Sequence, residues 1–486
     1  MSLKKQAVSG IFWTSLQQAG AQIINFVISV ILARILLPEH FGRVALLGVF
    51  IAIGNTIVDG GMNQSLIRKK NPDIRDYTSV FYANFIFSIL LYVILYFSAP
   101  LISKFYNQPL MSGLLRVYGL VLFINALVFV QNVKLTIALN FRKQLLISLP
   151  STILSGIVGI FMAWQGFNEW SLIGVAISRV TFLAIQLWIY DPWRPSVKYF
   201  DKNVLKHHLE YGVKIAISGI IDTFFQEIYA LVIGKFFNIS QLGYFNRANQ
   251  LRQLPERNIS GALGKVTFPL LSKIKDNRDR LKSAYKRILK ISTFIVSPVL
   301  LLMAALADPL FRWLYTDKWL PAVPYFQILS IAGIFRIVNS FNINILVLKG
   351  SGNQFLWVSI LKKIALVIVM LALLPMGIYG LIWAVVIQSF IATWINAYYS
   401  QKFLNYNVLQ QFGDMFPIVL NALFASVIVW YVDSNYMGHL NNFLRIIAGI
   451  TLGGGIYLVT SIIFFFDLCL EIKDIMRGMS EKLKFY

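Results

Sequence analysis

The stretch YFNRANQLRQLPERN, residues 244–258, decides how this sequence folds. It holds three arginines, three asparagines, two glutamines and a glutamate, in a chain that is 57% hydrophobic. If the stretch is a loop in water, the chain has one membrane-spanning helix fewer than if the stretch crosses the bilayer. Because each span reverses the direction of the chain, the two alternatives place all later loops on opposite sides of the membrane.

Long apolar runs set the class of protein. They recur along all 486 residues and reach the length that is typical of transmembrane helices. Trp and Tyr often fall near the ends of the runs, where amphipathic rings favour the membrane interface. A formal charge of +23 would suggest nucleic acid in a soluble chain, whereas in a membrane protein Lys and Arg set topology. The sequence therefore predicts an all-α integral membrane protein, without a disulfide because Cys469 is the only cysteine.

The apolar runs predict about fourteen transmembrane helices. The first run shows no cleavage pattern after it, so we expect it to be retained as a span. The expected spans are 9–37, 40–66, 77–103, 110–136, 145–165, 169–190, 206–235, 241–271, 284–308, 322–348, 355–375, 377–401, 412–432 and 442–467.

The distribution of Lys and Arg tests this count. With the eighth span included, most of the lysines and arginines fall on alternate connections, such as 68–75, 194–206 and 273–287. Such an asymmetry marks the cytoplasmic side and places both termini there. Without the eighth span the pattern disappears from that point onward, so residues 244–258 are predicted to lie within a helix that crosses the membrane.

An internal repeat gives the same answer. ARILLPEHFGRVA (33–45) aligns with GKFFNISQLGYFN (234–246), and APLISKFY (99–106) aligns with DPLFRWLY (308–315). Equivalent points lie six spans apart, and an even number means a parallel repeat about an axis along the membrane normal. Residues 244–258 then correspond to the apolar span at 43–57. Charges at that depth would be costly in lipid, so they are expected to line a water-filled cavity.

The repeat divides the chain into parts. We expect an N-lobe of six helices at 1–190, a cytoplasmic linker at 191–205 and a C-lobe of six helices at 206–405. Two extra helices at 412–470 and a basic cytoplasmic tail at 471–486 follow. The prolines and charges of DPWRPSVKYFDKN (191–203) favour the boundary between the lobes.

Polar residues recur at helical spacing on the first, second, seventh and eighth spans. Because these are two repeat-related pairs of helices, their polar faces predict one central cavity between the lobes. Alternatively, Asn and Gln can simply join helices through hydrogen bonds, which stays open for the first span. The residues expected to line the cavity are Gln18, Gln22, Asn25, Asn55, Asn63, Ser218, Gln226, Asn249, Gln253 and Ser260.

The charges within the spans are mostly positive. A positive cavity of low dielectric constant favours an anionic head group such as phosphate. We expect the head group to bind at Arg257 and Arg252, with Lys214, Arg247 and Lys265 as further cations. Arg252 and Glu256 are four residues apart and can instead form a neutralising pair. The acids Asp59, Asp222 and Glu256 are candidates for coupling transport to Na⁺ or H⁺.

Motifs for other chemistry are missing from the sequence. There is no HExxH, no CxxC and no dinucleotide-binding loop, and in GALGKVT (261–267) valine follows Gly-Lys where a phosphate loop needs Ser or Thr. The four histidines, His40, His207, His208 and His439, lack the spacing of metal ligands and are expected to be solvated. We therefore expect no cofactor.

Three segments resemble a known family. They are LARILLPEHFGRVALLGVF…VDGGMNQSLIRK (32–69), the linker WRP (193–195) and LGYFNRANQLRQLPERNISGALGKVTFPLLSKIKDNRDRLKSAYKR (242–287). The resemblance is to the Wzx-type polysaccharide transporters of the multidrug/oligosaccharidyl-lipid/polysaccharide exporter superfamily. The cavity residues of that family vary widely, so the residues named above follow from helical spacing alone.

The resemblance implies a function. It implies a flippase of the bacterial inner membrane that moves undecaprenyl-diphosphate-linked sugar units by alternating access, for O-antigen, capsule or exopolysaccharide synthesis. The pyrophosphate would then be the head group at Arg257, and the last two helices would guide the lipid tail. Partners would be the lipid-linked glycan, the bilayer, and the polymerase and glycosyltransferases of the pathway, with no nucleic acid.

Two alternatives remain. One is a cation-coupled multidrug exporter of the same fold, which twelve spans and a less cationic pocket would favour. The other is a membrane glycosyltransferase, polymerase or ligase, which would need reactive groups on a sizeable outer loop. The longest outer connection, at 309–321, offers only Arg312, Asp317 and Lys318, so no enzyme activity is expected.

Overall fold

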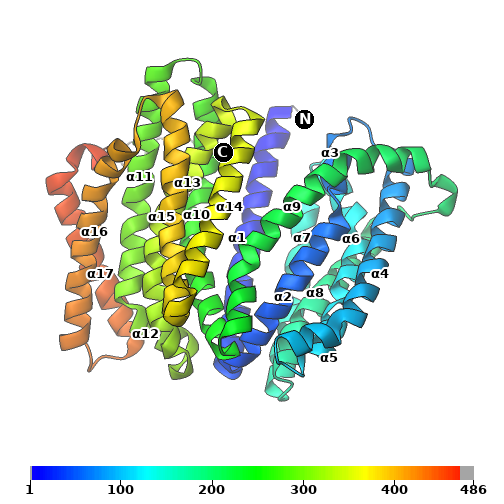
Figure 1. The fold of residues 1–486 in the computed structure, drawn as a ribbon, viewed down its shortest axis with the longest axis horizontal. Helices are drawn as coiled ribbons and strands as arrows, with labels where there is room; N and C mark the ends of the chain where they lie inside the picture. The colour runs from blue at the N-terminus through cyan, green and yellow to red at the C-terminus, as the bar shows by residue number, and fades with distance from the viewer. Residues whose placement is uncertain (1–2, 471–486) are drawn as a thin grey trace. The chain divides into compact units, whose positions relative to one another are not determined.

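The regular secondary structure of the described chain is entirely helical in the computed structural model (Figure 1). The structure describes residues 3–470, without the side chains of residues 3–9, 11, 262, 265 and 266. The basic tail predicted at 471–486 lies outside the described residues. The all-α fold class is confirmed. Contacts divide the chain into two compact units, Met1–Asn246 and Arg247–Tyr486, called unit 1 and unit 2 below.

Unit 1 packs its helices in neighbouring pairs. α7 contacts both α1 and α8, α6 contacts α4 and α8, and α9 packs along α2. A short 3₁₀ turn at Val197–Tyr199 lies in the linker before α9. The helices are α1 (Leu3–Ile35), α2 (Pro38–Asp59), α3 (Met62–Arg68), α4 (Ile74–Phe105), α5 (Met111–Tyr118), α6 (Leu120–Ile137), α7 (Phe141–Trp164), α8 (Glu169–Tyr190), α9 (Lys202–Phe236) and the first residues of α10 (Ile239–Lys273).

Unit 2 is built around α11 and α13. α13 packs against α11 and α15, α16 packs against α11, and α17 packs against α16. A large buried cluster joins α11, α13 and α16, and includes Tyr285, Phe341 and Ile418. The remaining helices of unit 2 are α11 (Arg278–Ala305), α12 (Ala307–Tyr315), α13 (Val323–Lys349), α14 (Gly352–Leu373), α15 (Gly377–Leu404), α16 (Val408–Tyr436) and α17 (Asn442–Phe464), with 3₁₀ turns at Asp317–Ala322 and Leu374–Met376.

Twelve segments of the described chain are long and apolar enough to cross a membrane, so the predicted count of fourteen is not confirmed. The difference has two sources. The segment Gly352–Leu404 counts once but contains two helices, α14 and α15. α10 does not count because of its polar residues, although its 35 residues form one continuous helix. Fourteen helices of the described chain have 18 residues or more.

Three elements differ from the prediction, and local chemistry explains two of the differences. The second predicted span ends early because Gly60 and Gly61 adopt positive φ angles of 53° and 69°, which separate α2 from α3. α9 starts at Lys202 because Asp201 caps it, accepting bonds from the backbone N–H groups of Asn203 and Val204. The connection predicted as a loop at 309–321 instead holds α12 and a 3₁₀ turn.

The boundary between the two units lies after Asn246, within the polar stretch 244–258. The sequence repeat places the lobe boundary at the linker 191–205 instead. Unit 1 therefore contains α9, the first helix of the predicted C-lobe. The two lobes and the central cavity between them stay predictions.

Candidate functional site

The polar stretch of α10 holds a buried ion pair. Arg252 is fully buried, and its Nη1 donates to Glu256 Oε1 at 2.6 Å while Nη2 donates to Asn249 Oδ1 at 2.7 Å. All three side chains belong to successive turns of one helix, as residues three and four apart must. Of the two roles open for Arg252, this geometry favours the neutralising pair. A head-group role for Arg252 stays a prediction.

Glu256 also connects α10 to α13. The carboxylate is buried against Gly333 of α13, where an added Cβ would overlap Oε1. Its other oxygen, Oε2, lies 4.0 Å from Arg336 Nε, whose side chain is 52% exposed. Glycine at position 333 therefore provides the space in which the carboxylate packs between helices.

Arg257 differs from Arg252. It is exposed and makes no hydrogen bond or ion pair with any described residue. Both Arg257 and Arg336 are close enough to Glu256 to act on it electrostatically. Three arginines thus surround one glutamate, which leaves an excess of positive charge beside a helix of transmembrane length. Exposed guanidinium groups of this kind bind phosphate oxygens well.

Arg247 lies in a different environment from the other arginines of α10. Its guanidinium carbon is 5.2 Å from the ring centre of Tyr315 and 5.4 Å from that of Trp319, and Nη1 donates to Gln250 Oε1 at 3.4 Å. The side chain is buried. Cation–π contacts with two rings of the α11–α13 connection favour an anchoring role, because they hold the cation away from ligands. The side chain of Lys265 is not among those described.

α9 carries the predicted polar residues of the seventh span. Lys214, Ser218, Asp222 and Gln226 are all exposed and recur every four residues along the helix. Lys214 also borders an open cavity of about 480 Å³ near the start of α9. The charged side chains that line the cavity are Lys202, Lys206, Glu210 and Lys214, with leucine and valine side chains between them.

The predicted cavity residues of α1 to α3 have mixed surroundings. Gln18 is exposed, and Gln22, Asn25 and Asn63 are half-buried. Asn55 accepts a hydrogen bond from Asn125 Nδ2 at 2.9 Å and so joins α2 to α6. This is the alternative role, in which Asn and Gln join helices without lining a cavity.

Asp59 ends α2, directly before the two glycines of the break. Its Oδ1 is buried and has no hydrogen-bond partner within the described residues. On α10, Gln253 and Ser260 are half-buried.

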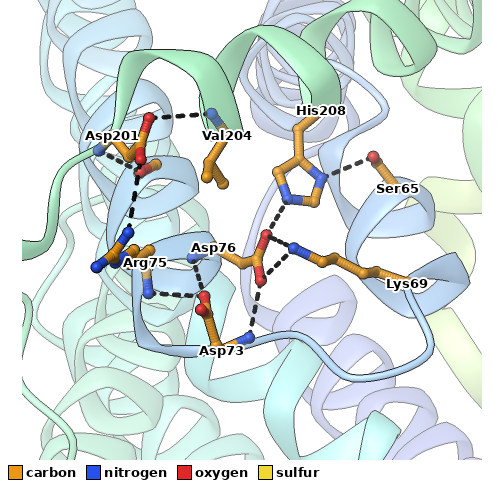
Figure 2. Close-up of polar contacts among 9 residues, drawn as sticks. Ser65, Lys69, Asp73, Arg75, Asp76, Asp201, Val204 and His208 are labelled. Carbon is orange, nitrogen blue, oxygen red and sulfur yellow. Dashed lines mark hydrogen bonds and ion pairs between the residues drawn. The ribbon is translucent and has the colours of Figure 1, made fainter.

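A buried polar network on unit 1 was missed by the sequence prediction (Figure 2). His208 Nδ1 lies 2.8 Å from Ser65 Oγ, and His208 Nε2 lies 2.9 Å from Asp76 Oδ1. Asp76 also accepts two bonds from Lys69 Nζ, at 2.6 and 2.7 Å, and one from the backbone N–H of Asp73. The network joins α3, α4 and α9 at the end of unit 1 that carries the 191–201 linker, called the linker side below.

This network has the residues of a Ser–His–Asp triad but not its accessibility. Ser65, Asp76 and His208 are all buried, so no substrate can reach the serine hydroxyl. Every polar group in the network has a partner, which is what a structural brace requires. The expectation that His208 is solvated was wrong, because residues 132 positions apart in the chain enclose it.

His40 was also wrongly expected to be solvated. It is buried in unit 1 at the start of α2, where Nδ1 accepts the backbone N–H of Leu37 at 3.3 Å. Its Nε2 lies 3.6 Å from Glu169 and 3.7 Å from Glu39. Arg43 donates to both of these glutamates. The histidine therefore belongs to a charged cluster that ties α2 to α8.

A comparison with protein families matches residues 31–324, more than half of the chain, to the family described as polysaccharide biosynthesis protein. Relatives with characterised names are distant but cover most of the sequence. Teichuronic acid biosynthesis protein TuaB of Bacillus subtilis is 25% identical over 73% of this chain and 74% of its own. Succinoglycan biosynthesis transport protein ExoT of Rhizobium meliloti is 23% identical over 98% of this chain and 96% of its own.

Solved structures share the fold. The lipid II flippase MurJ, in an inward closed conformation, superposes with a TM-score of 0.73 and 17% identity, over 94% of this chain and 100% of that one. A multidrug resistance MATE family transporter of the MOP superfamily, facing inward, gives a TM-score of 0.59 and 16% identity, over 82% of this chain and 98% of that one. At these identities the likeness concerns the fold alone. The match over residues 31–324 shows that this multi-pass membrane protein belongs to the polysaccharide biosynthesis protein family.

Proposed function

We propose that this protein is a flippase that moves oligosaccharide units linked to a polyprenyl diphosphate across the bacterial inner membrane. The units would serve the synthesis of a surface polysaccharide. Membership of the family and the names of the relatives TuaB and ExoT support the polysaccharide pathway. The fold shared with MurJ and with MATE transporters supports transport by alternating access and not catalysis.

The observation that carries the proposal is the exposed guanidinium of Arg257 on α10, which acts electrostatically on Glu256 as Arg336 does. An arginine at the centre of a spanning helix costs about 2.5–3.5 kcal/mol when it faces lipid. If Arg257 faces the predicted cavity instead, its guanidinium, which has no hydrogen-bond or ion-pair partner among the described residues, is available to an anion. A diphosphate supplies several charged oxygens that an arginine can engage in pairs.

The direction of transport follows from the charge distribution. The linker side of unit 1 carries Arg68, Lys69, Lys70, Arg75, Arg194, Lys198, Lys202 and Lys206. The excess of positive residues supports a cytoplasmic position for this side, and the alternation of positive connections along the sequence supports the same position for both termini. The lipid-linked glycan would enter from the cytoplasmic leaflet, where glycosyltransferases assemble it, and leave toward a polymerase on the other side.

The fold likeness to MATE transporters keeps one alternative open, a cation-coupled drug exporter. The two functions differ in the charge of the cargo. An exporter of cationic drugs needs acidic or neutral contacts, whereas Arg257 and Arg336 would repel a cationic drug. The positive charge on α10 therefore favours the anionic lipid.

Purified protein in liposomes tests the proposal. A fluorescent lipid-linked oligosaccharide is placed in both leaflets, and a membrane-impermeant reagent then measures the fraction that becomes accessible with time. We expect faster exchange between leaflets than in protein-free liposomes, and no stimulation of the exchange of a cationic dye. Export of the dye without movement of the glycan lipid would replace the proposal by the drug exporter.

A further inference from the structure

The start of α9 combines a cluster of positive charge with a shallow, mostly apolar hollow whose lining residues all belong to α9. Lys202, Lys206 and Lys214 line the hollow together with one acid, Glu210. Lys206 Nζ lies 4.0 Å from Glu210 Oε1, and both side chains are mostly exposed, so this pair neutralises little of the charge. The Asp201 carboxylate caps α9 and offsets the positive end of the helix dipole, so the excess charge comes from the side chains. Three lysines against one glutamate leave this surface net positive, which favours anions.

An exposed apolar stripe continues from the lysines along α9. Val213, Ile217, Ile221 and Phe224 have exposed fractions of 48%, 55%, 43% and 41%. Their spacing of three and four residues places them on one side of the helix, over a length of about 16 Å. The stripe starts beside the lysine cluster, so that a single ligand can contact both.

A polar row lies directly beside the stripe. The row consists of the exposed side chains of Lys214, Ser218, Asp222 and Gln226 on the same helix. Ser218 directly follows Ile217, so the row is rotated from the stripe by about 100° around the helix axis. Hydroxyl, amide and carboxylate groups of this kind are hydrogen-bond partners for sugars. Lys214 therefore lies where the cationic, apolar and polar surfaces of α9 meet.

The remaining side of α9 is fixed to unit 1. His208 bonds to Ser65 and Asp76, and Thr223 Oγ1 lies 3.1 Å from Thr56 Oγ1. An added Cβ at Gly212 would overlap the backbone of Gly60, so the helices touch there. These contacts hold α9 by one side and leave the stripe and the polar row uncovered by unit 1.

We infer that this part of α9 is a loading groove for the polyprenyl-diphosphate-linked glycan, distinct from the arginines of α10. Lys202, Lys206 and Lys214 would hold the diphosphate, the apolar stripe would hold the first isoprene units, and the polar row would face the sugars. The inference rests on the proposed function. Bulk anionic phospholipid is the other candidate occupant, but it has no large head group that would make use of the polar row.

Binding to the full chain in nanodiscs of neutral lipid tests the groove. The probes are geranylgeranyl diphosphate, inorganic pyrophosphate and phosphatidylglycerol, the last used as a competitor. Lys202→Gln with Lys206→Gln should weaken binding of both diphosphates at least tenfold, because charge-assisted hydrogen bonds are lost. Ile217→Ala with Ile221→Ala should weaken geranylgeranyl diphosphate about tenfold and leave pyrophosphate unchanged, because only apolar contact is removed.

Matched controls separate the groove from general surface effects. Lys198→Gln with Lys275→Gln removes the same charge from exposed positions elsewhere. Ile368→Ala with Leu371→Ala removes exposed apolar surface from α14. Neither control should change affinity. Equal losses in the controls, unchanged affinity in the groove variants, or full displacement by equimolar phosphatidylglycerol would overturn the inference.

The inference and the proposed function can fail separately. If the groove variants bind normally but the protein still moves lipid-linked glycan between leaflets, the groove is wrong and the function stands. If the wild-type protein binds geranylgeranyl diphosphate through the groove but moves no glycan lipid, the groove stands and the flippase function is wrong.

Discussion

Gly42 and Gly243 contact each other through their backbones in a reciprocal way. A Cβ added to Gly42 would overlap the carbonyl oxygen of Ile239, and a Cβ added to Gly243 would overlap that of Pro38. In the repeat found from the sequence, Gly42 corresponds to Gly243 and Pro38 corresponds to Ile239. The two contacts are therefore equivalent: exchanging each residue for its counterpart in the repeat turns one contact into the other. This is expected where two related elements meet about a two-fold axis.

This contact predicts the effect of adding a single methyl group. Gly42→Ala and Gly243→Ala should each destabilise the protein by about 1–3 kcal/mol or more, because the methyl group meets backbone that cannot turn away. The midpoint of thermal unfolding in detergent measures the change. Gly48→Ala, on the same helix α2 with open space at its Cβ position, is the control and should keep or raise the midpoint. A normal midpoint for Gly42→Ala would show that the two helices do not touch in solution.

The His208 network predicts coupled effects on stability. Ser65→Ala or His208→Ala leaves a buried partner without its hydrogen bond, and each should cost about 1–3 kcal/mol of unfolding free energy. The double variant should cost clearly less than the sum, because both changes remove the same bond. Denaturation in mixed micelles measures all three variants. His207→Ala, at the exposed neighbouring position, should have little effect. Strict additivity would mean that Ser65 and His208 do not interact.

The polar helix α10 could be predicted from the sequence because two independent patterns required it. Neither pattern depends on hydropathy. By hydropathy alone, α10 is not among the apolar segments that could cross a membrane. The alternation of positive loops and the repeat at 33–45 both counted a span at 241–271, and the structure gives a helix at Ile239–Lys273. Charge asymmetry and repetition reflect the path of the whole chain and are therefore insensitive to local polarity.

Contacts between distant residues could not be predicted. No local signal marks Asp76, Ser65 and His208 as partners, and only the packing of α9 on α3 and α4 brings them together. Helical spacing also grouped Arg247 with the ligand-binding cations. It could not show that α12 and the following turn, which were expected to be a loop, place Tyr315 and Trp319 against that arginine.

Asp59 and Asp222 are the proposed groups for ion coupling. One carboxylate oxygen of Asp59, Oδ1, is buried without a hydrogen-bond partner in the described chain, which leaves it available to a proton or Na⁺. Asp59→Asn and Asp222→Asn keep the size of the side chain and remove its charge. We expect at least one of them to abolish the dependence of glycan-lipid transport on pH or sodium. Transport that keeps the wild-type dependence on both in each variant would exclude these two acids.

We expect the last two helices, α16 and α17, to be required for transport but not for membrane insertion of the other helices. α16 packs on α11 through Met415 and Ile418, and Tyr457 of α17 donates to the carbonyl oxygen of Phe294 at 2.9 Å. A chain ending after residue 405 should insert with its other spans but lose function, and co-expressed 406–486 should restore it. Full complementation by the shorter chain alone would show that the pair does not hold the lipid tail.

Arg252 and Arg257, five residues apart on α10, predict opposite results for the same substitution. Arg252→Gln should destabilise the protein by about 3–5 kcal/mol, because it leaves the buried carboxylate of Glu256 without its closest partner. Arg257→Gln breaks no contact among the described residues and should leave the unfolding midpoint unchanged. If Arg257 binds the pyrophosphate, the affinity for geranylgeranyl diphosphate that remains in the Lys202→Gln/Lys206→Gln background should fall about ten- to a hundredfold, the range of about 1.5–3 kcal/mol for charged hydrogen bonds. Arg257→Lys should restore part of the affinity, because it keeps the charge but not the paired geometry. A well-folded Arg257→Gln variant with normal affinity would leave Arg257 without a role in binding, and a fall in its unfolding midpoint would show that it braces the helices as Arg252 does.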